Sequence, residues 1–436
     1  MPAVVVLSFF ISLTFQSVEC GDATSCRQAA LDAQSRSDFE LFHDLAWRAV
    51  QKGPRNDPEL MTLLARAQSL SGRPGDALVM LRRLAQLGAS VDVGNDDFQR
   101  VRALPAWPEL AASFERDKPA DRAAPETPVP PPAKRADGPK DSAPPVPGKK
   151  TESAKEALET PAAAPASAEE VLPEAMASLE PAGLAYDAVS RRFIVGDRRE
   201  NKLVIFDDVF KRATNMVGAG SAGFFALTAI EIDPKRGDLW ITNSGADRGN
   251  SLHKLQLVSG RVLFEISVPA ELGPTALVDA AVLGDGEVLL LDAEGRRILG
   301  LLPAARSFKR AATVDVEGAT SITSNGGSIA YVAHPKGLLR VDLAARKATP
   351  VRGAPSGLLR IRSNGHTLIG VQPAGKGHRI VRIRLDATGS KMARMDVLDA
   401  GTTMPDAAAL TIADGILYYL TSVNGDAVLR RARLQK

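Results

Sequence analysis

The side chains that most often perform chemistry are few in this chain and lie far apart. The five histidines, at positions His43, His253, His334, His366 and His378, include no pair at the spacing of metal ligands. The two cysteines, Cys20 and Cys26, are too few for a disulfide scaffold or a four-cysteine zinc site. The sequence contains no Gly-x-Ser-x-Gly elbow and no phosphate-binding glycine loop. A well-known catalytic motif is therefore absent, and the repeats that position the remaining polar residues become the main source of information.

The last 258 residues, 179–436, repeat one pattern six times: an alternating strand, a polar turn and two further strands. The turn residues recur at intervals of 46, 52, 40, 39 and 50, at positions Asp187, Asp233, Asp285, Asn325, Asn364 and Asp414. A mean period of roughly 45 residues is the length of a four-stranded propeller blade. Four turns place Gly after Asp or Asn, at Gly286, Gly326, Gly365 and Gly415, where a tight hairpin needs positive φ. We predict an all-β, six-bladed propeller over 179–436.

An N-terminal region, 24–116, has helical periodicity instead. Asp57-Pro58 is a helix start signal, apolar residues follow at helical spacing, and Gly72 and Gly88 end two successive helices. This hairpin resembles one tetratricopeptide repeat, with a less clear pair before it and a third after it. An all-α unit of tetratricopeptide-like hairpins would bind a protein or peptide partner, and a small helical bundle is the alternative.

The segment 117–178 separates the two units. Thirteen of the 29 prolines lie between Lys118 and Ser178, with many alanines, and no aromatic residue occurs between Phe114 and Tyr186. Such a composition buries too little apolar surface to offset its ordering entropy. We predict a disordered Pro/Ala-rich linker that tethers two independently folding units and raises the effective concentration of their separate partners.

The N-terminal residues resemble a secretory signal. The apolar run from Ala3 to Phe15 is too short to cross a bilayer but suits the core of a signal peptide, although no basic residue precedes it. Val18 and Cys20 fit the −3 and −1 cleavage positions, which predicts a signal peptide over 1–20. A buried N-terminal helix is the alternative. No later stretch is long enough for a membrane span, so we expect an exported bacterial protein, periplasmic or secreted.

The C-terminal repeats are similar to the six-bladed propellers of the gluconolactonase, senescence-marker-protein and NHL-like superfamily. The segments PAGLAYDAVSRRFIVGD, VDAAVLGDGEVLLLD and GLLRIRSNGHTLIGVQ carry this resemblance, which covers about 60% of the chain. Enzymes of that family hydrolyse lactones with a divalent cation on the propeller axis, held by Glu, Asn and Asp. In this chain Glu180 matches the first ligand in an altered motif, Val278-Asp279 replaces the Asn-Asp pair, and Ser356-Gly357 lacks the third Asp.

The candidate ligand-binding residues at the propeller axis or mouth follow from this comparison. Asp279, Glu317 and Asp406 begin blades at equivalent positions, so Glu180, Asp279 and Asp406 could bind calcium or another divalent cation. The alternative is that these carboxylates lie in turns or cap strand ends. His334 and His378 fall near the ends of second strands, where loops line a propeller mouth.

Charge provides a further constraint on function. The net charge of +3 comes from 54 basic and 51 acidic residues, which argues against nucleic acid as a partner. A cluster of arginines on late strands nevertheless leaves RNA as a third hypothesis, and it contains Arg379, Arg382, Arg384, Arg430, Arg431 and Arg433. Our leading hypothesis is an exported, non-catalytic protein that binds a protein at the helical unit and an unknown ligand at the propeller face. The alternative is a metal-dependent lactonase.

Overall fold

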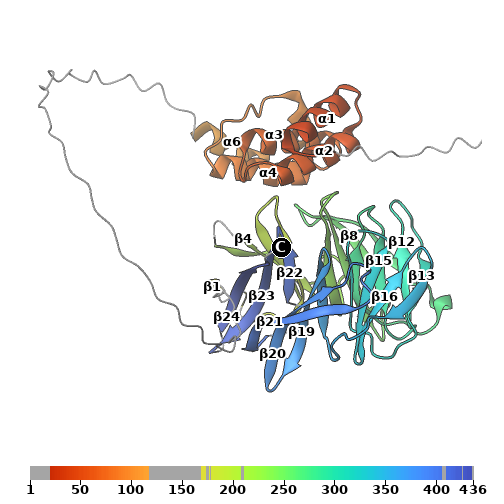
Figure 1. Ribbon diagram of the computed structural model, residues 1–436. Coiled ribbons are helices and arrows are strands. Elements are labelled where there is room, and N and C mark those ends of the chain that lie inside the picture. Colours follow the sequence, from red (N-terminus) through yellow and green to blue (C-terminus); the bar gives the residue numbers. More distant parts are fainter. Residues whose placement is uncertain are drawn as a thin grey trace, which may run out of the picture.

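A computed structural model of the chain contains a small helical unit packed on a six-bladed β-propeller (Figure 1). The structure describes residues 20–116, 168–172, 176, 178–207, 211–404, 409–424 and 426–434. Most of the predicted signal peptide, most of the predicted linker and Asp406 lie outside these ranges. Among the described residues, no helix is both long and apolar enough to cross a membrane.

Two central helices of the helical unit begin or end at the residues that the sequence predicts. Asp57 caps the third helix by accepting hydrogen bonds from the backbone N–H groups of Glu59 and Leu60, and Pro58 occupies the first turn. Gly72 and Gly88, with φ of 80° and 67°, follow the ends of the third and fourth helices. The elements are α1 (Ala23–Ser35), α2 (Phe39–Lys52), α3 (Pro58–Leu70), α4 (Pro74–Gln86), η1 (Asp96–Phe98), α5 (Gln99–Arg102) and α6 (Trp107–Arg116).

Six four-stranded antiparallel sheets form the propeller, which confirms this prediction. Blade one contains β2 (Pro181–Asp187), β3 (Arg192–Asp197), β4 (Lys202–Asp207) and β5 (Ala213–Val217). Blade two contains β6 (Leu227–Asp233), β7 (Asp238–Gly245), β8 (Gly249–Gln256) and β9 (Val262–Ser267). After η2 (Ala270–Leu272), blade three contains β10 (Leu277–Val282), β11 (Val288–Asp292), β12 (Arg297–Leu301) and β13 (Lys309–Thr313).

The remaining three blades follow the same order from the axis outward. Blade four contains β14 (Ser321–Ser324), β15 (Ile329–His334), β16 (Gly337–Asp342) and β17 (Lys347–Pro350). Blade five contains β18 (Arg360–Asn364), β19 (Thr367–Ala374), β20 (Gly377–Leu385) and β21 (Met392–Thr402). Blade six contains β22 (Leu410–Ala413), β23 (Ile416–Val423), β24 (Asp426–Arg433) and β1 (Ala168–Val171).

The tight turns between first and second strands have the predicted backbone. Gly286, Gly326, Gly365 and Gly415 adopt φ values of 90°, 89°, 64° and 71°. These values lie in the left-handed region, where a side chain is strained. The Asp-Gly and Asn-Gly pairs therefore specify where four of the six blades turn.

The ring closes through a strand that the sequence analysis places in the linker. Strand β1, within the predicted linker 117–178, pairs antiparallel with β24, so Ala168 lies opposite Arg431. The propeller thus begins before the predicted boundary at residue 179. A four-residue strand in an Ala- and Glu-rich context carries no periodicity of its own, and its pairing with the end of the chain depends on the closed ring.

The helical unit packs against blades one and two rather than standing apart on a tether. One continuous apolar cluster joins Trp47 and Leu81 of the helices to Leu239, Leu255 and Leu257 of the second blade. The indole Nε1–H of Trp47 donates a hydrogen bond of 2.8 Å to the carbonyl of Pro234. The expectation of two separately acting units therefore needs correction, because their cores are shared.

Candidate functional site in the axial channel

The first strands of the six blades lie next to one another around a central axis. Since side chains alternate along a strand, every second residue of each first strand points toward the axis. Two successive layers result, one nearer the helical unit and one two residues earlier on each strand. The nearer layer contains Ala185, Glu231, Ala281, Thr323, Arg362 and Thr411, and the deeper layer contains Gly183, Ala229, Asp279, Ser321, Arg360 and Ala409.

Asp279 is fully buried in the deeper layer and is surrounded by donors. Its carboxylate forms ion pairs with Arg360 and, at 3.2 Å, with Nη1 of Arg362. The Ser321 hydroxyl and the Ile322 N–H donate hydrogen bonds to the same carboxylate oxygen, Oδ2, at 2.5 and 3.0 Å. Burial alone would raise the pKa of Asp279, but the two guanidinium groups and the hydrogen bonds hold it below its ordinary value.

Glu231 continues this network across the axis. Its Oε1 atom lies 3.1 Å from Nη2 of Arg362, and blades two and five face each other in a six-bladed ring. Burial, with a contribution from the charge of Asp279, raises the pKa of Glu231 to about 7, although Arg362 opposes the shift. The Glu231 side chain is 20% exposed. It is therefore a titratable group at the wall of an open space.

We call Asp279, Glu231, Arg360 and Arg362 the axial plug, because these four side chains cross the channel. Two long arginine side chains from one strand fit there because Gly and Ala occupy most facing positions of blades one, two, three and six. Paired in this way, the buried charges avoid the large penalty of an isolated ion. These ion pairs link blades two, three and five across the axis.

A cavity of about 450 Å³ lies between the axial plug and the helical unit. The side chains of Trp47 and Gln51, from α2, form part of its wall on the helical side, and both donate hydrogen bonds to the carbonyl of Pro234. The other polar residues that line it include Glu231, Arg362, Thr323, Ser324, Ser363 and Thr411. A space of this size with aromatic, hydroxyl and charged groups is suited to a small polar ligand.

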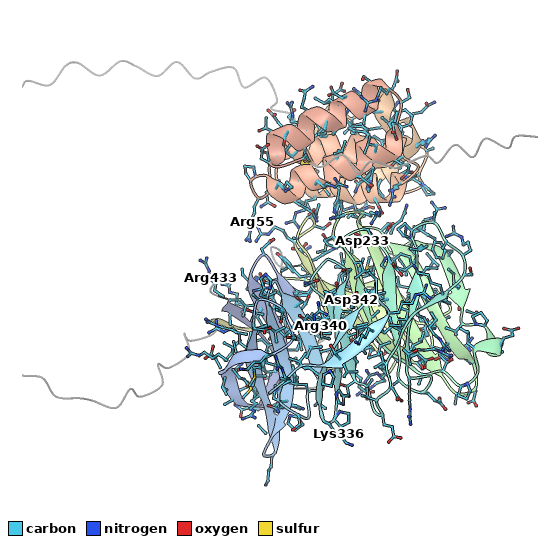
Figure 2. All side chains as sticks on the ribbon, turned by 45° about the vertical axis from the view of Figure 1, so that its right-hand side comes forward. Arg55, Asp233, Lys336, Arg340, Asp342 and Arg433 are labelled. Atoms are coloured by element: carbon cyan, nitrogen blue, oxygen red, sulfur yellow. A yellow bond between two sulfur atoms is a disulfide. The ribbon has the colours of Figure 1, made fainter. Side chains whose placement is uncertain are left out.

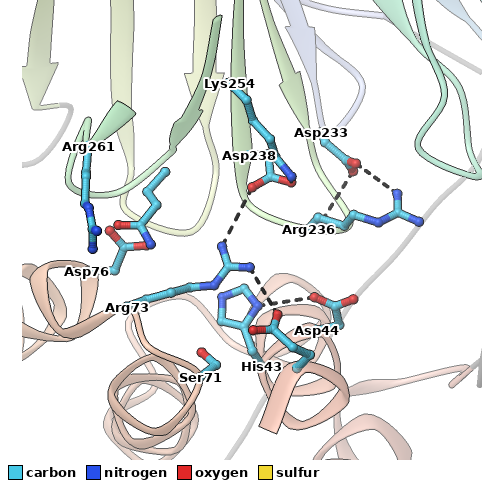
Figure 3. A network of polar contacts seen from close by, with 12 residues as sticks. His43, Asp44, Ser71, Arg73, Asp76, Asp233, Arg236, Asp238, Lys254 and Arg261 are labelled. Atoms are coloured by element: carbon cyan, nitrogen blue, oxygen red, sulfur yellow. Dashed lines mark hydrogen bonds and ion pairs between the residues drawn. The ribbon is translucent and has the colours of Figure 1, made fainter. Parts of the chain in front are cut away.

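A second polar network holds the helical unit in place beside the cavity (Figure 3). The Arg73 guanidinium lies 3.7 Å from Asp238 of β7, and Lys254 contacts the same carboxylate at 2.6 Å. Asp76 accepts a hydrogen bond of 3.0 Å from the Ser259 N–H. Burial raises the pKa of both Asp76 and Asp238, and neighbouring cations only partly offset it. We call Arg73, Asp76, Asp238, Lys254 and Ser259 the docking network.

The structure separates the carboxylates that the resemblance brings together as metal ligands. Glu180 precedes β2 at the end of the strand away from the helical unit, is exposed, and pairs with Arg199 at 3.1 Å. Glu317 is exposed and pairs with Arg296 at 2.6 Å. Within the described part of the chain, no three His, Cys, Asp or Glu side chains are grouped closely enough to hold a metal ion. The described members of the expected set therefore do not fit a calcium site.

The two candidate histidines also lie away from the cavity. His334 ends β15 and His378 lies near the start of β20, at the end of the propeller opposite the helical unit. Figure 2 shows this arrangement, because Lys336, next to His334, lies far from the helices, whereas Asp233 lies close to them. Burial lowers the pKa of His334, with a smaller contribution from Lys336. Neither histidine reaches Asp279.

Sequence reasoning missed three of the four residues of the axial plug. Glu231, Arg360 and Arg362 are charged residues at inward positions of a first strand, where the other blades place small or hydroxyl side chains. A charge at an inward position of a propeller repeat is the signal that could have identified them. The disulfide between Cys20 and Cys26 was missed as well, and it leaves no free cysteine in the chain.

The arginine cluster on the late strands is only partly paired, because Arg382, Arg384 and Arg430 are its members with a carboxylate at ion-pair distance among the described residues. Arg382, Arg384 and Arg394 all lie within 4.0 Å of the Asp396 carboxylate. Arg430 pairs with Asp399 at 3.5 Å. These internal pairs leave less positive charge for an acidic polymer than the sequence alone indicates.

Comparisons with known proteins find only remote similarity. The sequence matches no family model, and no curated protein matches it. Among solved structures, a putative glucose dehydrogenase from Thermus thermophilus has a TM-score of 0.44 and 15% identity, covering 61% of this chain and 100% of its own. A streptogramin B lyase structure has a TM-score of 0.42 and 18% identity over 62% of this chain and 88% of its own. The major Malassezia sympodialis allergen Mala s 1 has a TM-score of 0.43 and 14% identity, covering 58% of this chain and 92% of its own. Such similarity carries no argument about activity, and the propeller fold rests on the strand pairing described above.

Proposed function

We propose that this chain is an exported, non-catalytic binding protein, in which the propeller holds a small polar ligand in the axial cavity and the helical unit contributes to partner binding. The observation that carries the proposal is the pairing of Asp279 with Arg360 and Arg362. These guanidinium groups occupy the position beside the carboxylate that a divalent cation would need. The alternative, metal-dependent lactone hydrolysis, would require both arginines to move away and leave a buried carboxylate behind.

The cavity supports ligand binding because its polar groups are fixed before a ligand arrives. Arg362 is held by Asp279 and by the carbonyl of Ile361, and Trp47 is held by Pro234. Side chains held in this way lose little conformational freedom when a ligand binds. Because α2 forms part of the wall, a ligand in the cavity would contact both units and strengthen their association.

The remaining parts of the proposal rest on two other features. Antiparallel packing of α1 with α2 and of α3 with α4 supports tetratricopeptide-like hairpins. The disulfide between Cys20 and Cys26 supports export, because such bonds persist mainly in oxidising compartments. Cleavage of a leader after Cys20 would remove this bond, so we place the proposed cleavage before Cys20.

The decisive experiment measures the thermal midpoint of the full chain with and without Ca²⁺ or Zn²⁺, together with hydrolysis of a panel of aliphatic and sugar lactones. We expect no shift with either ion and no turnover. If a metal raises the midpoint and supports turnover that Asp279→Ala abolishes, the lactonase alternative is correct and our proposal is wrong.

Ligand binding is tested separately by native mass spectrometry of the full chain isolated from its own cell envelope or medium. We expect a co-purifying small molecule, and we expect the cavity-filling variant Ala281→Leu to lose it while retaining the thermal midpoint to within a few degrees. The variant Ala348→Leu, on the partly buried outermost strand β17, is the matched control because it lies far from the cavity. Equal ligand occupancy in Ala281→Leu and the control would contradict binding in the axial cavity.

A further inference from the structure

A second groove, distinct from the axial cavity, runs along the seam between α4 and the outer half of blade one. Its volume is about 480 Å³. Helix α4 forms one side, and β4 and β5 form the other. The lining residues are Val79, Met80, Arg82, Arg83, Gln86, Ser190, Arg192, Ile205, Asp207, Arg212 and Thr214.

The groove is positively charged, because four arginines line it with one carboxylate. Two of the arginines are already engaged: Arg83 donates to Asp207 at 3.0 Å, and Arg192 pairs with the buried carboxylate of Asp187 at 3.3 Å. Arg82 is partly exposed and Arg212 is exposed, and within the described ranges no carboxylate lies at ion-pair distance from either. Two cations at the rim are therefore available to a partner.

The floor and one border of the groove favour an extended peptide. Val79 and Ile205 are partly exposed and supply apolar surface between the charged rims, whereas Met80 is buried. Strand β5 is the outermost strand of its sheet, so its outer backbone edge has no neighbouring strand in the described part of the chain, and Thr214 of this strand lines the groove. An edge of this kind accepts a further strand through backbone hydrogen bonds.

We propose that this groove binds an extended acidic peptide segment of a partner protein, whose carboxylates pair with Arg82 and Arg212 while its backbone lies along β5. The proposal rests on the proposed binding function and specifies the partner surface of the helical unit. Alternating acidic and apolar side chains suit the site, because an added strand directs one set toward the arginines and the other toward the apolar floor.

Fluorescence anisotropy with the full chain tests the proposal. The probe is a fluorescein-labelled peptide of about ten residues that alternates glutamate and valine. One comparison peptide replaces every glutamate with lysine, and another replaces every valine with proline, which keeps the charge but removes backbone N–H donors. The charge-reversing variant Arg82→Glu/Arg212→Glu is compared with Arg55→Glu/Arg310→Glu, which changes the net charge equally at exposed sites elsewhere.

We expect the glutamate–valine peptide to bind, with an affinity that falls as salt is added, and the lysine and proline peptides to bind at least about tenfold more weakly. The groove variant should weaken binding by at least about tenfold, and the control variant by less than about twofold. Both variants should keep the thermal midpoint of the wild type, because the four arginines lie at the surface.

Several results would overturn the proposal. Equal loss in the groove and control variants would show a nonspecific charge effect, and equal binding of the lysine peptide would remove the charge complementarity. An RNA oligomer that binds more tightly than the peptide, and is lost in the groove variant, would assign the groove to nucleic acid. Absence of any peptide binding would reject this groove as a peptide site but leave the axial ligand site untouched, because the metal, lactone and mass-spectrometry experiments test that site independently.

Discussion

The axial plug and the docking network are both buried groups of charged residues, but their buried carboxylates Asp279 and Asp76 are compensated differently. In the plug, Asp279 has two arginines and two hydrogen-bond donors, and its pKa is lowered despite complete burial. In the docking network, Asp76 is almost equally buried, and burial raises its pKa despite hydrogen bonding from Ser259 and the nearby charge of Arg73. A fully compensated carboxylate stabilises the fold when ionised, whereas an undercompensated one destabilises it.

This difference indicates different roles for the two networks. Asp279 and its two arginines belong to the propeller itself and should contribute to its stability at neutral pH. The docking network joins parts of the chain far apart in sequence, and its stability should depend more on apolar packing around Trp47 than on its charges. Four substitutions test this difference between the two networks.

The largest effect is expected from Arg360→Met. The variant removes one cation from Asp279 and leaves a buried carboxylate that Arg362 alone cannot compensate, which should cost about 3–5 kcal/mol of unfolding free energy. Urea denaturation followed by circular dichroism measures the loss. Arg310→Met, at an exposed position of β13, is the control and should cost less than about 0.5 kcal/mol. A loss below about 1 kcal/mol for Arg360→Met would contradict the role of the plug.

Trp47→Ala should have the next largest effect and should act on docking. It removes a fully buried indole and the hydrogen bond to Pro234, at a cost of about 3 kcal/mol. We expect the helical unit to unfold before the propeller in urea, so that one transition becomes two. Trp47→Phe keeps most of the apolar contact and should show a smaller separation. A single transition at a lower midpoint in Trp47→Ala would mean that the two units remain coupled without the indole.

Glu231→Gln should change how stability depends on pH. The pKa of Glu231 rises from 4.5 to about 7 in the folded protein, where Arg362, Asp279 and Arg360 are the charged groups around it. A raised carboxyl pKa means that the folded state binds the proton more tightly, so its contribution is present at acidic pH and is lost as pH rises toward and through 7.

At about pH 8, Glu231→Gln should therefore be more stable than the wild type, by at most about 2–3 kcal/mol, with the loss of the Arg362 ion pair reducing this gain. At about pH 5 the two proteins should be similar. Urea midpoints across this range provide the measurement. If the urea midpoints of the two proteins change with pH in the same way, Glu231 does not titrate in this range.

The smallest effect is expected from Asp76→Asn. The amide oxygen can still accept the Ser259 N–H, and removing an ionised group that burial destabilises should change the unfolding free energy by less than about 1 kcal/mol at neutral pH. The matched change Asp279→Asn should cost clearly more, because two arginines lose their shared partner. Similar values for the two variants would remove the distinction between the networks.

Part of this molecule could be read from local sequence alone. The helix boundaries at Asp57, Gly72 and Gly88 and the positive-φ glycines of four blade turns follow from the conformational preferences of single residues, and the structure confirms them. The regular spacing of the turns predicts six blades, because each blade buries its faces only against its neighbours.

Tertiary structure alone decided the rest. Glu231, Asp279 and Arg362 lie on blades two, three and five, so only closure of the ring brings them together. The same closure recruits β1 from the predicted linker, and the shared core around Trp47 joins units that composition separates. Local patterns depend on neighbours within a few residues, whereas a buried charge is tolerable only beside partners that distant parts of the chain supply. The sequence therefore determined the elements and their repeat, and the fold decided which charges meet at the axis.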